Sequence, residues 1–311
     1  MTLAFVFPGQ GSQSVGMLDG FAAHPAVRET FAEASDALGE DLWALVAQGP
    51  AEALNLTTNT QPVMLAAGVA VWRAWLAAGG PRPAVVAGHS LGEYSALVAA
   101  GALAFRDAVP LVRFRAQAMQ EAVPAGEGAM AAIMGGDDGA VTSACAEAEQ
   151  GQVVEAVNFN APGQVVIAGH REAVERAIAL AKQMGAKRGV LLPVSAPFHS
   201  SLLRPAADRL AARLAQVQVA TPEIPVIHNV DVAEHRGHDA IRDALARQAA
   251  SPVHWTATVR AMTARGVTHV VECGPGKVLA GLVKRIADGV PAYALTDGEA
   301  IAATLAELKA S

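Results

Sequence analysis

Cysteine is nearly absent from this chain of 311 residues, which contains only Cys145 and Cys273. Neither belongs to a Cys-x-x-Cys pair or to a cysteine–histidine pattern with the spacing of metal ligands, so we expect no disulfide framework and no zinc site. Such low cysteine usage is typical of proteins in a reducing compartment, and we therefore expect a cytoplasmic location.

Long apolar runs and an excess of positive charge are also missing. The apolar segment 3–7 is short and has no basic flank, which argues against a signal peptide, and no later segment has the length of a membrane span. The 29 acidic residues outnumber the 23 basic ones and give a net charge of −6. We therefore expect neither nucleic acid nor a membrane as a partner.

Apolar residues, by contrast, are abundant: hydrophobic residues make up 52% of the chain and charged residues 17%, a balance typical of a large buried core. Short apolar runs such as 3–7 and 83–88 alternate with helix-like segments such as 61–79. In the last of these, Pro62 suits the first helical turn and Gly79 the C-terminal cap. Continuous apolar strands separated by helices predict a parallel sheet covered on both faces.

The pattern changes in the middle of the chain, where 127–196 has the order strand, helix, strand, strand, helix, strand. This order is typical of ferredoxin-like folds. We therefore expect an α/β protein made of an α/β-hydrolase-like core with a parallel sheet, formed by 1–126 and 197–311, and an inserted ferredoxin-like subdomain at 127–196. The expected boundaries of the inserted elements are strands at 129–135, 153–159, 164–169 and 188–194 and helices at 137–150 and 171–186.

Ser90 is the first candidate for chemistry, because Gly88-His89-Ser90-Leu91-Gly92 matches the pattern G-x-S-x-G. An apolar strand precedes the motif and a helix follows it, which is the context of a nucleophile elbow. In such a turn the glycines allow a close backbone crossing, and the helix N-terminus lies where an oxyanion would form. The alternative is a serine that only caps the helix.

A nucleophilic serine needs a base, and His199 is the strongest of nine histidines. It follows the expected strand 188–194 on a loop rich in serine and proline, a position where α/β folds carry catalytic groups. His89 adjoins Ser90, but the neighbour of an elbow serine points elsewhere. We expect surface positions for His24, His170, His235 and His238 and core positions for His228 and His269, whereas His254 could be either.

The loop 7–13 also follows an expected strand, and Gly9 and Gly11 suggest that a ligand approaches its backbone closely. A dinucleotide fingerprint fails here because Ser14 occupies the third glycine position. An oxyanion-binding loop is the best functional interpretation, and a plain tight turn is the alternative.

The segments that carry these candidates, taken in order, resemble malonyl-CoA:acyl-carrier-protein transacylases of bacterial type II fatty-acid synthesis. The resemblance extends from Leu3 to about Ala287 and rests on FPGQGSQ, TQPVM, GHSLGEYSA, FRAQAMQEAVP, VNFNAPGQVVIAG, PVSAPFHSSL, PVIHNVD, RQAASPVHW and ECGPGKVL. It implies an S-malonyltransferase that moves malonyl from coenzyme A to the thiol of acyl carrier protein through a malonyl-serine. No cofactor is implied beyond these two substrates, and the inserted subdomain is a hallmark of the family.

The resemblance also assigns roles to individual residues. It makes Ser90 the nucleophile and His199 the general base and acid, oriented by the main-chain carbonyl of Gln248. That carbonyl would remove the need for an acid, for which Asp107, Asp137 and Asp138 are poor candidates because they suit helix starts. The backbone N–H groups of Gln10 and Leu91 would form the oxyanion hole.

Three further residues are implied to bind substrate: Arg115, Gln61 and Phe198. Helical geometry allows only one of Arg113 and Arg115 to face a pocket, and the resemblance selects Arg115 to bind the malonyl carboxylate. Without the resemblance, we would expect Arg115 to be a solvated arginine on the surface of the helix. Phe198 supports the choice of malonyl over bulkier branched units.

Other functions share these motifs. A serine thioesterase would hydrolyse the acyl-enzyme without a carrier, and the acyltransferase subunit of malonate decarboxylase is a second enzyme alternative. A third alternative, a non-catalytic module that only docks a carrier protein, would not need Ser90, His199 and Arg115 together. For an acidic carrier protein, the candidate docking residues are Lys182, Lys187, Arg188, Arg204, Lys277, Lys284 and Arg285.

Overall fold

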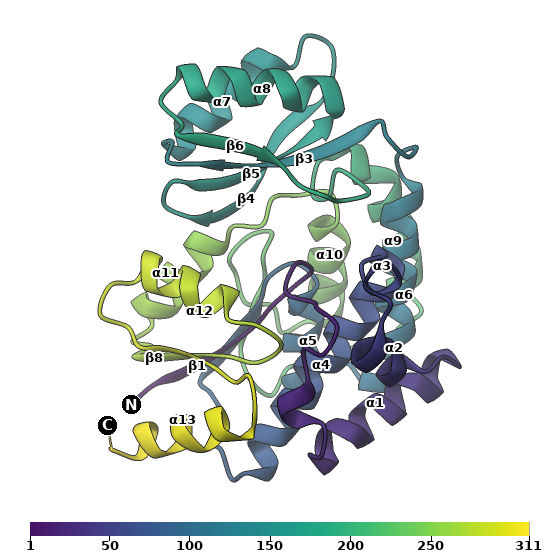
Figure 1. Ribbon diagram of the computed structural model, residues 1–311, viewed down its shortest axis with the longest axis vertical. Coiled ribbons are helices and arrows are strands. Elements are labelled where there is room, and N and C mark those ends of the chain that lie inside the picture. Colours follow the sequence, from purple (N-terminus) through teal and green to yellow (C-terminus); the bar gives the residue numbers. More distant parts are fainter. Residues whose placement is uncertain (311) are drawn as a thin grey trace.

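The computed structural model describes residues 1–310, which contain two separate β-sheets, each accompanied by helices (Figure 1). The larger sheet is parallel throughout and has the strand order β7-β2-β1-β8-β9. Its central strand is entirely buried. The strands are β1 (Leu3–Phe7), β2 (Val85–Gly88), β7 (Val226–Ile227), β8 (His269–Glu272) and β9 (Ala292–Ala294).

Helices cover both faces of this sheet. Alternate residues of β1 point to opposite faces and therefore contact different helices. Phe5 packs edge-on against Trp72 and Trp75 of α4, whereas Val6 belongs to the core formed with α11 and α12. The helices outside the smaller sheet are α1 (Pro25–Leu38), α2 (Leu42–Gln48), α3 (Ala51–Leu54), α4 (Thr57–Ala77), α5 (Gly92–Ala99), α6 (Phe105–Glu121), α9 (Arg204–Leu214), α10 (His238–Gln248), α11 (Trp255–Ala264), α12 (Val278–Ile286) and α13 (Gly298–Ala310), with short 3-10 turns at Asp19–Phe21 and Ser201–Leu203.

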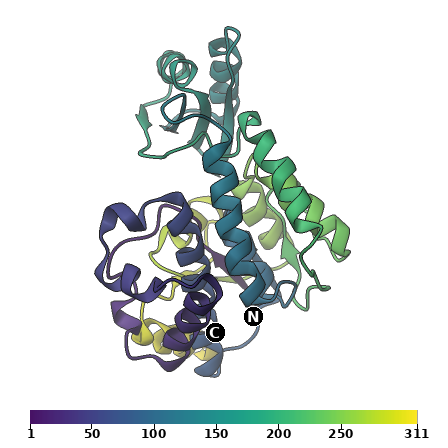
Figure 2. The same cartoon turned by 90° about the vertical axis from the view of Figure 1, so that its right-hand side faces the viewer.

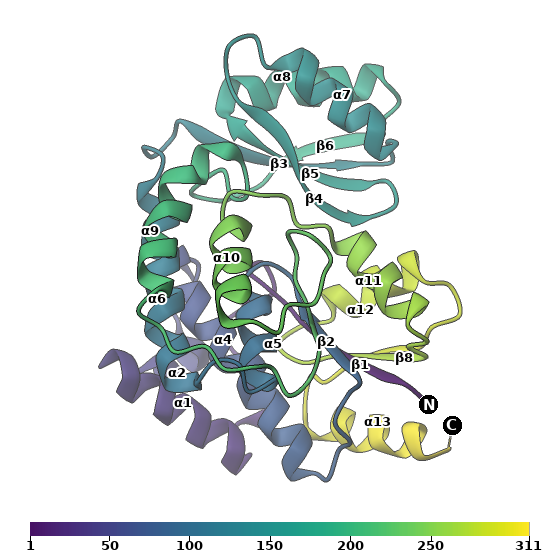
Figure 3. The same ribbon diagram turned by 180° about the vertical axis from the view of Figure 1, so that it is seen from behind.

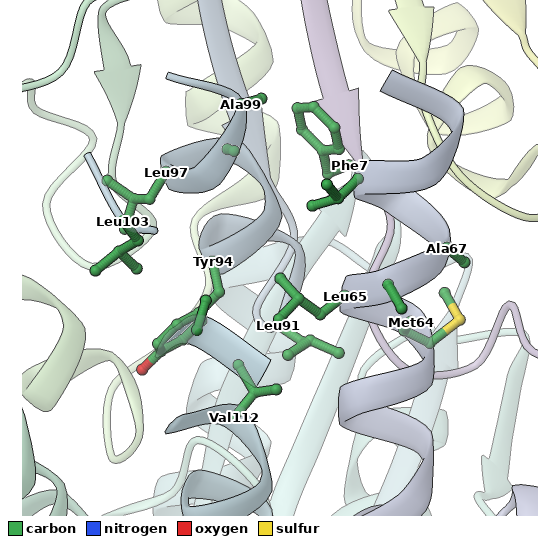
Figure 4. Close-up of a cluster of buried hydrophobic side chains, with 14 of the residues drawn as sticks. Phe7, Met64, Leu65, Ala67, Leu91, Tyr94, Leu97, Ala99, Leu103 and Val112 are labelled. Atoms are coloured by element: carbon green, nitrogen blue, oxygen red, sulfur yellow. The ribbon is translucent and has the colours of Figure 1, made fainter. Parts of the chain in front are cut away.

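The helix after β2, α5, is buried at the centre of the molecule. Figure 4 shows Leu91, Tyr94 and Leu97 of this region packed among side chains of α4 and α6, beside Phe7 at the end of β1. This apolar packing fixes the direction in which α5 leaves the end of β2. No helix within residues 1–310 combines the length and apolarity that crossing a membrane requires.

The smaller sheet is antiparallel, with the strand order β4-β5-β3-β6. Its elements are β3 (Gly128–Met134), α7 (Asp138–Ala148), β4 (Val154–Ala161), β5 (Gln164–His170), α8 (Arg171–Gln183) and β6 (Arg188–Leu191). Both helices lie on the face turned away from the larger sheet (Figures 1 and 3). The opposite face contributes Met130, Val157 and Val166 to the main core, so the two sheets share one packed interior.

The long helix α6 runs from the larger sheet toward the smaller one, and α9 packs alongside it (Figure 2). The chain enters the smaller sheet after α6 and returns through the loop that precedes α9. These two helices therefore join the two parts of the molecule on one side of the space between the sheets.

Several element boundaries differ from the sequence-based prediction. Helix α4 begins at Thr57, so Pro62 lies inside the helix and not in its first turn. The Thr60 hydroxyl donates to the carbonyls of Leu54 and Leu56, which supports the additional turn. Pro110 likewise lies inside a helix, α6, which begins at Phe105. Strand β6 ends at Leu191 and not at 194, because only Arg188–Leu191 pair with β3.

Candidate active site

Ser90 lies in the tight turn between β2 and α5, with a backbone φ of +52°. A Cβ at Gly88 would lie 1.9 Å from the carbonyl carbon of Gly92, and a Cβ at Gly92 would lie 2.0 Å from the carbonyl oxygen of Phe7. Only glycine fits either position. The left-handed conformation of a residue with a side chain is strained and occurs mainly where the surrounding structure enforces it. The turn therefore has the properties of a nucleophile elbow.

His199 meets the serine across the cleft, with 2.7 Å between Ser90 Oγ and His199 Nε2. The other ring nitrogen, Nδ1, lies 2.9 Å from the main-chain oxygen of Gln248. Since a carbonyl can only accept, Nδ1 carries the proton and Nε2 is free to take one from the serine. His199 also has a positive φ, of +66°.

The aspartates considered as an acid that would orient His199 have other positions in the structure. Asp137 caps α7 through the backbone N–H groups of Gly139 and Ala140, and Asp107 lies in the first turn of α6. Asp138 lies in the first turn of α7.

The environment of His199 keeps its imidazole neutral. Burial lowers the pKa of His199 to about 3, and the nearby positive charge of Arg115 adds to this effect. A neutral imidazole is the form that can accept a proton. The structure thus holds a base in its active form at neutral pH.

Arg115 is 1% exposed, and its guanidinium points at the nucleophile. Nη2 donates to Ser90 Oγ at 3.1 Å and to Gln248 Oε1 at 2.9 Å, and Nη1 donates to Gln61 Oε1 at 2.7 Å. All three acceptors are uncharged, and among residues 1–310 no carboxylate lies within ion-pair distance of this guanidinium. Burial lowers the pKa of Arg115. Arg113, on another side of the same helix, pairs with Glu40 near the surface.

The loop after β1 lies against the turn that holds Ser90. A Cβ at Gly9 would be 2.5 Å from the carbonyl oxygen of His89, and Gly11 has a φ of +109°. The backbone N–H groups of Gln10 and Leu91 donate to no acceptor within the described chain. Both residues line the same cavity as Ser90. Two free donors beside a nucleophile are what an oxyanion hole requires.

These groups line a cleft of about 120 Å³ between the two sheets. Gln61 lies on one side of it, Phe198 precedes the base, and the smaller sheet contributes Met130 and Asn158. His89 was expected to point elsewhere but also lines the cleft, where its Nε2 lies 2.8 Å from Asn160 Oδ1. The structure therefore brings together every site residue that the sequence predicts: Ser90, His199, Gln248, Gln10, Leu91, Arg115, Gln61 and Phe198.

Three polar residues behind the nucleophile were not given a role by the sequence. Glu93 and Asn229 are completely buried, and His228 is buried beside them. Glu93 Oε1 accepts from His228 Nδ1 at 2.7 Å, and Asn229 Oδ1 accepts from the backbone N–H of Ser90 at 2.7 Å. These residues belong to the segments GHSLGEYSA and PVIHNVD, so their presence in motifs was the only available signal.

The remaining histidines lie outside the cleft. His254 precedes α11 and stacks on Phe159, and His235 pairs with Asp231. His269, predicted to lie in the core, is only partly buried at the start of β8, where it stacks on Tyr293 of the edge strand β9. In the described part of the chain, no three histidine, cysteine or acidic side chains gather as metal ligands would.

Comparisons with known proteins place these observations in a family. The family model for the acyl transferase domain matches residues 4–297. The chain is 61% identical to the malonyl CoA-acyl carrier protein transacylase of Escherichia coli K12 over 303 residues, which are 97% of this chain and 98% of that protein.

Solved structures agree. The acyl-carrier-protein S-malonyltransferase of Burkholderia pseudomallei superposes with a TM-score of 0.97 at 62% identity, covering 98% of this chain and 100% of the other. A malonyl-transacylase solved in complex with its type II PKS acyl-carrier protein gives a TM-score of 0.97 at 53% identity, covering 99% of this chain and 100% of the other. The resemblance inferred from the sequence is confirmed, and the chain belongs to the acyl transferase family.

Proposed function

We propose that this protein transfers malonyl from malonyl-CoA to the phosphopantetheine thiol of an acyl carrier protein, through a malonyl ester on Ser90. Its relatives in Escherichia coli and Burkholderia pseudomallei carry this activity in their names. A neighbour solved with a carrier protein supports the identity of the partner. The reaction supplies malonyl units for fatty-acid synthesis.

The observation that carries this proposal is the buried guanidinium of Arg115, 3.1 Å from the nucleophilic oxygen and without a carboxylate partner. A buried charge is costly unless it is paired. Malonyl differs from acetyl by a carboxylate, which a guanidinium can bind with two parallel hydrogen bonds. A malonyl group on Ser90 would thus provide the missing partner.

In the proposed first half-reaction, His199 Nε2 takes the proton of Ser90 Oγ as this oxygen attacks the thioester carbonyl carbon. The N–H groups of Gln10 and Leu91 donate to the oxyanion, and one such donor typically stabilises a transition state by about 3 kcal/mol. The tetrahedral intermediate collapses, the C–S bond breaks, and His199 returns the proton to the coenzyme A thiolate.

The second half-reaction runs the same steps in reverse. His199 takes the proton of the carrier's pantetheine thiol, and the sulfur attacks the malonyl-Ser90 ester. A thioester is exchanged for an ester and then for a thioester, with no net oxidation or reduction. We accordingly propose that the protein needs no metal or redox cofactor.

The arrangement of the two sheets supports a finer description of the fold. We propose an α/β-hydrolase-like core at 1–126 and 197–311 and a ferredoxin-like subdomain at 127–196, with the cleft between them. The parallel sheet and the β-α-β-β-α-β element order support this division. We also propose a cytoplasmic location, which the near absence of cysteine supports.

The carrier's docking surface stays a prediction. The basic candidates lie on or beside α8, β6, α9 and α12, and Arg285 already contacts Gln164 and the carbonyl of Pro162.

The loading step is tested by the mass of the intact protein after incubation with malonyl-CoA. We expect an increase by one malonyl group in the wild type and none in Ser90→Ala, because only the serine hydroxyl can form the ester. Loading of Ser90→Ala to the wild-type extent would refute the assignment of the nucleophile.

A further inference from the structure

Glu93 is a fully buried carboxylate that the mechanism above does not use. It lies in the first turn of α5 and accepts three hydrogen bonds. Oε1 accepts from His228 Nδ1 at 2.7 Å, and Oε2 accepts from the backbone N–H of Asn229 and from Gln248 Nε2, both at 2.9 Å. A buried carboxylate is tolerated only with such compensation, and two of its donors belong to residues that contact the catalytic groups.

The first connection leads to the backbone of the nucleophile. Asn229 Oδ1 accepts from the N–H of Ser90 at 2.7 Å, and Asn229 Nδ2 donates to the carbonyl of Gly88 at 2.7 Å. Gln248 Nε2 donates to the carbonyl of Ser90 at 3.0 Å. Both backbone polar groups of the strained Ser90 are thus held by side chains of residues that Glu93 contacts, through the backbone N–H of Asn229 and the side-chain amide of Gln248. Strained conformations persist only where the surroundings fix them in this way.

The second connection passes through Gln248 to the base and to the guanidinium. The main-chain oxygen of Gln248 accepts from His199 Nδ1 at 2.9 Å. Its side-chain amide lies between two charges, with Oε1 accepting from Arg115 Nη2 and Nε2 donating to Glu93 Oε2. The amide dipole is therefore aligned between the cation and the carboxylate. A change at Glu93 acts on Gln248 and, through its main-chain oxygen, on His199, whereas Arg115 keeps its separate hydrogen bond to Gln61.

We propose that Glu93 is a positioning residue for acyl transfer, whose carboxylate holds the Ser90 turn through Asn229 and the histidine-orienting residue Gln248 in one geometry. The inference rests on the proposed function only for the choice of malonyl-CoA as acyl donor. Glu93 touches no reacting atom, so its effect is on where Ser90 and His199 lie.

A matched control is available in Glu272, at the end of β8. It too is fully buried, and its Oε2 accepts from the backbone N–H of Ala280 at 2.8 Å. No hydrogen bond joins it to Ser90, His199, Asn229 or Gln248 within residues 1–310. Glu272→Gln therefore makes the same substitution at equal burial, away from the nucleophile. Because burial raises the pKa of Glu272 to about 7, both variants are compared with wild type at pH 8, where Glu272 is mainly ionised.

The test compares E93Q and E272Q by the rates of two reactions that depend on Ser90. The first uses phenylmethylsulfonyl fluoride, which forms a sulfonate ester with Ser90 Oγ as fluoride leaves and requires no malonyl recognition. The second is steady-state transfer from malonyl-CoA. We expect about 100-fold slower sulfonylation for E93Q, the loss typical of a displacement near 1 Å in a catalytic group. In the transfer reaction, we expect kcat of E93Q to fall while its KM for malonyl-CoA does not rise, because Arg115 remains. We expect E272Q to stay near wild type in both reactions.

Wild-type sulfonylation by folded E93Q, or an equal loss in E272Q, would overturn the proposal. If circular dichroism shows that E93Q does not fold, Glu93→Asp replaces it. This variant keeps the charge but is too short to reach all three donors, and sulfonylation at the wild-type rate would likewise overturn the proposal. A wild type that is sulfonylated but fails to transfer malonyl would refute the proposed function alone, and the comparison of E93Q with E272Q would still decide the role of Glu93.

Discussion

The nucleophilic oxygen of Ser90 lies between two nitrogens of opposite function, His199 Nε2 at 2.7 Å and Arg115 Nη2 at 3.1 Å. The first removes a proton, and the second can bind a charged acyl group beside the ester that forms. Selectivity at this scale comes from the charge of Arg115, because an uncharged acyl group brings no carboxylate to this buried guanidinium.

Replacing Arg115 tests this account of selectivity. In Arg115→Ala we expect malonyl transfer to fall about 100-fold more than acetyl transfer, since truncating one partner of a buried charge pair costs about 2–5 kcal/mol. The measurement is kcat/KM for malonyl-CoA and acetyl-CoA with the same carrier. Arg113→Ala is the matched control, because this arginine pairs with Glu40 on another side of α6, and its ratio should not change. Equal losses for both donors would remove Arg115 from substrate selection.

The state of His199 gives a prediction about pH. Since burial, with the charge of Arg115, lowers the pKa of His199 to about 3, the base is neutral in the free protein well below the ordinary histidine value of 6.5. We expect kcat/KM for acylation to show no loss assignable to His199 between about pH 8 and pH 5. An acid limb centred near 6.5 that persists in folded protein would contradict this.

The low pKa of His199 also affects the stability of the protein, which limits how far the pH can be lowered when kcat/KM is measured. The unfolded chain takes up a proton on His199 below pH 6.5, whereas the folded protein does so only near pH 3. The contribution of neutral His199 to stability is therefore complete above pH 6.5 and declines as pH falls toward 3. Activity must be recorded together with circular dichroism, so that unfolding is not taken for titration of the base.

At the scale of elements, the crossing of β1, β2 and α5 creates the site. Gly92→Ala would place a methyl 2.0 Å from the carbonyl oxygen of Phe7, so backbone must move. We expect a loss in the free energy of unfolding of about 3 kcal/mol. Gly281→Ala, in α12, meets no atom within 4 Å and should stabilise the protein by about 0.5–1 kcal/mol. Urea unfolding measures both, and a Gly92→Ala variant as stable as wild type would show that the crossing is not tight.

Elements with a clear local pattern could be predicted from the sequence. The apolar runs that became β1 and β2 and the helix that became α5 lie where periodicity and glycine signals placed them. Helices α1, α2 and α3 were not predicted. The last two are short, and they are stabilised by packing against neighbouring helices, α2 on α1 and α3 on α4. Strand β9 has three residues and exists through its pairing with β8, which no local pattern reveals.

At the scale of the whole molecule, the two sheets bring distant segments to one cleft. Ser90 and His199 are separated by 109 residues in the chain and meet within hydrogen-bond distance. The sequence could predict this pair because each residue lies in a recognisable motif. It could not predict the network of Glu93, since that network forms only where α5, the loop after β7 and the end of α10 come together.

The central claim is that this cleft loads a charged acyl group on Ser90 and keeps it until a thiol arrives. The most direct measurement follows the mass of isolated malonyl-enzyme over time, in buffer alone and after addition of holo acyl carrier protein. We predict that the malonyl mass persists in buffer and moves to the carrier on addition. Rapid loss of malonyl in buffer, with free malonate and no malonyl-carrier formed, would contradict the account and indicate a thioesterase.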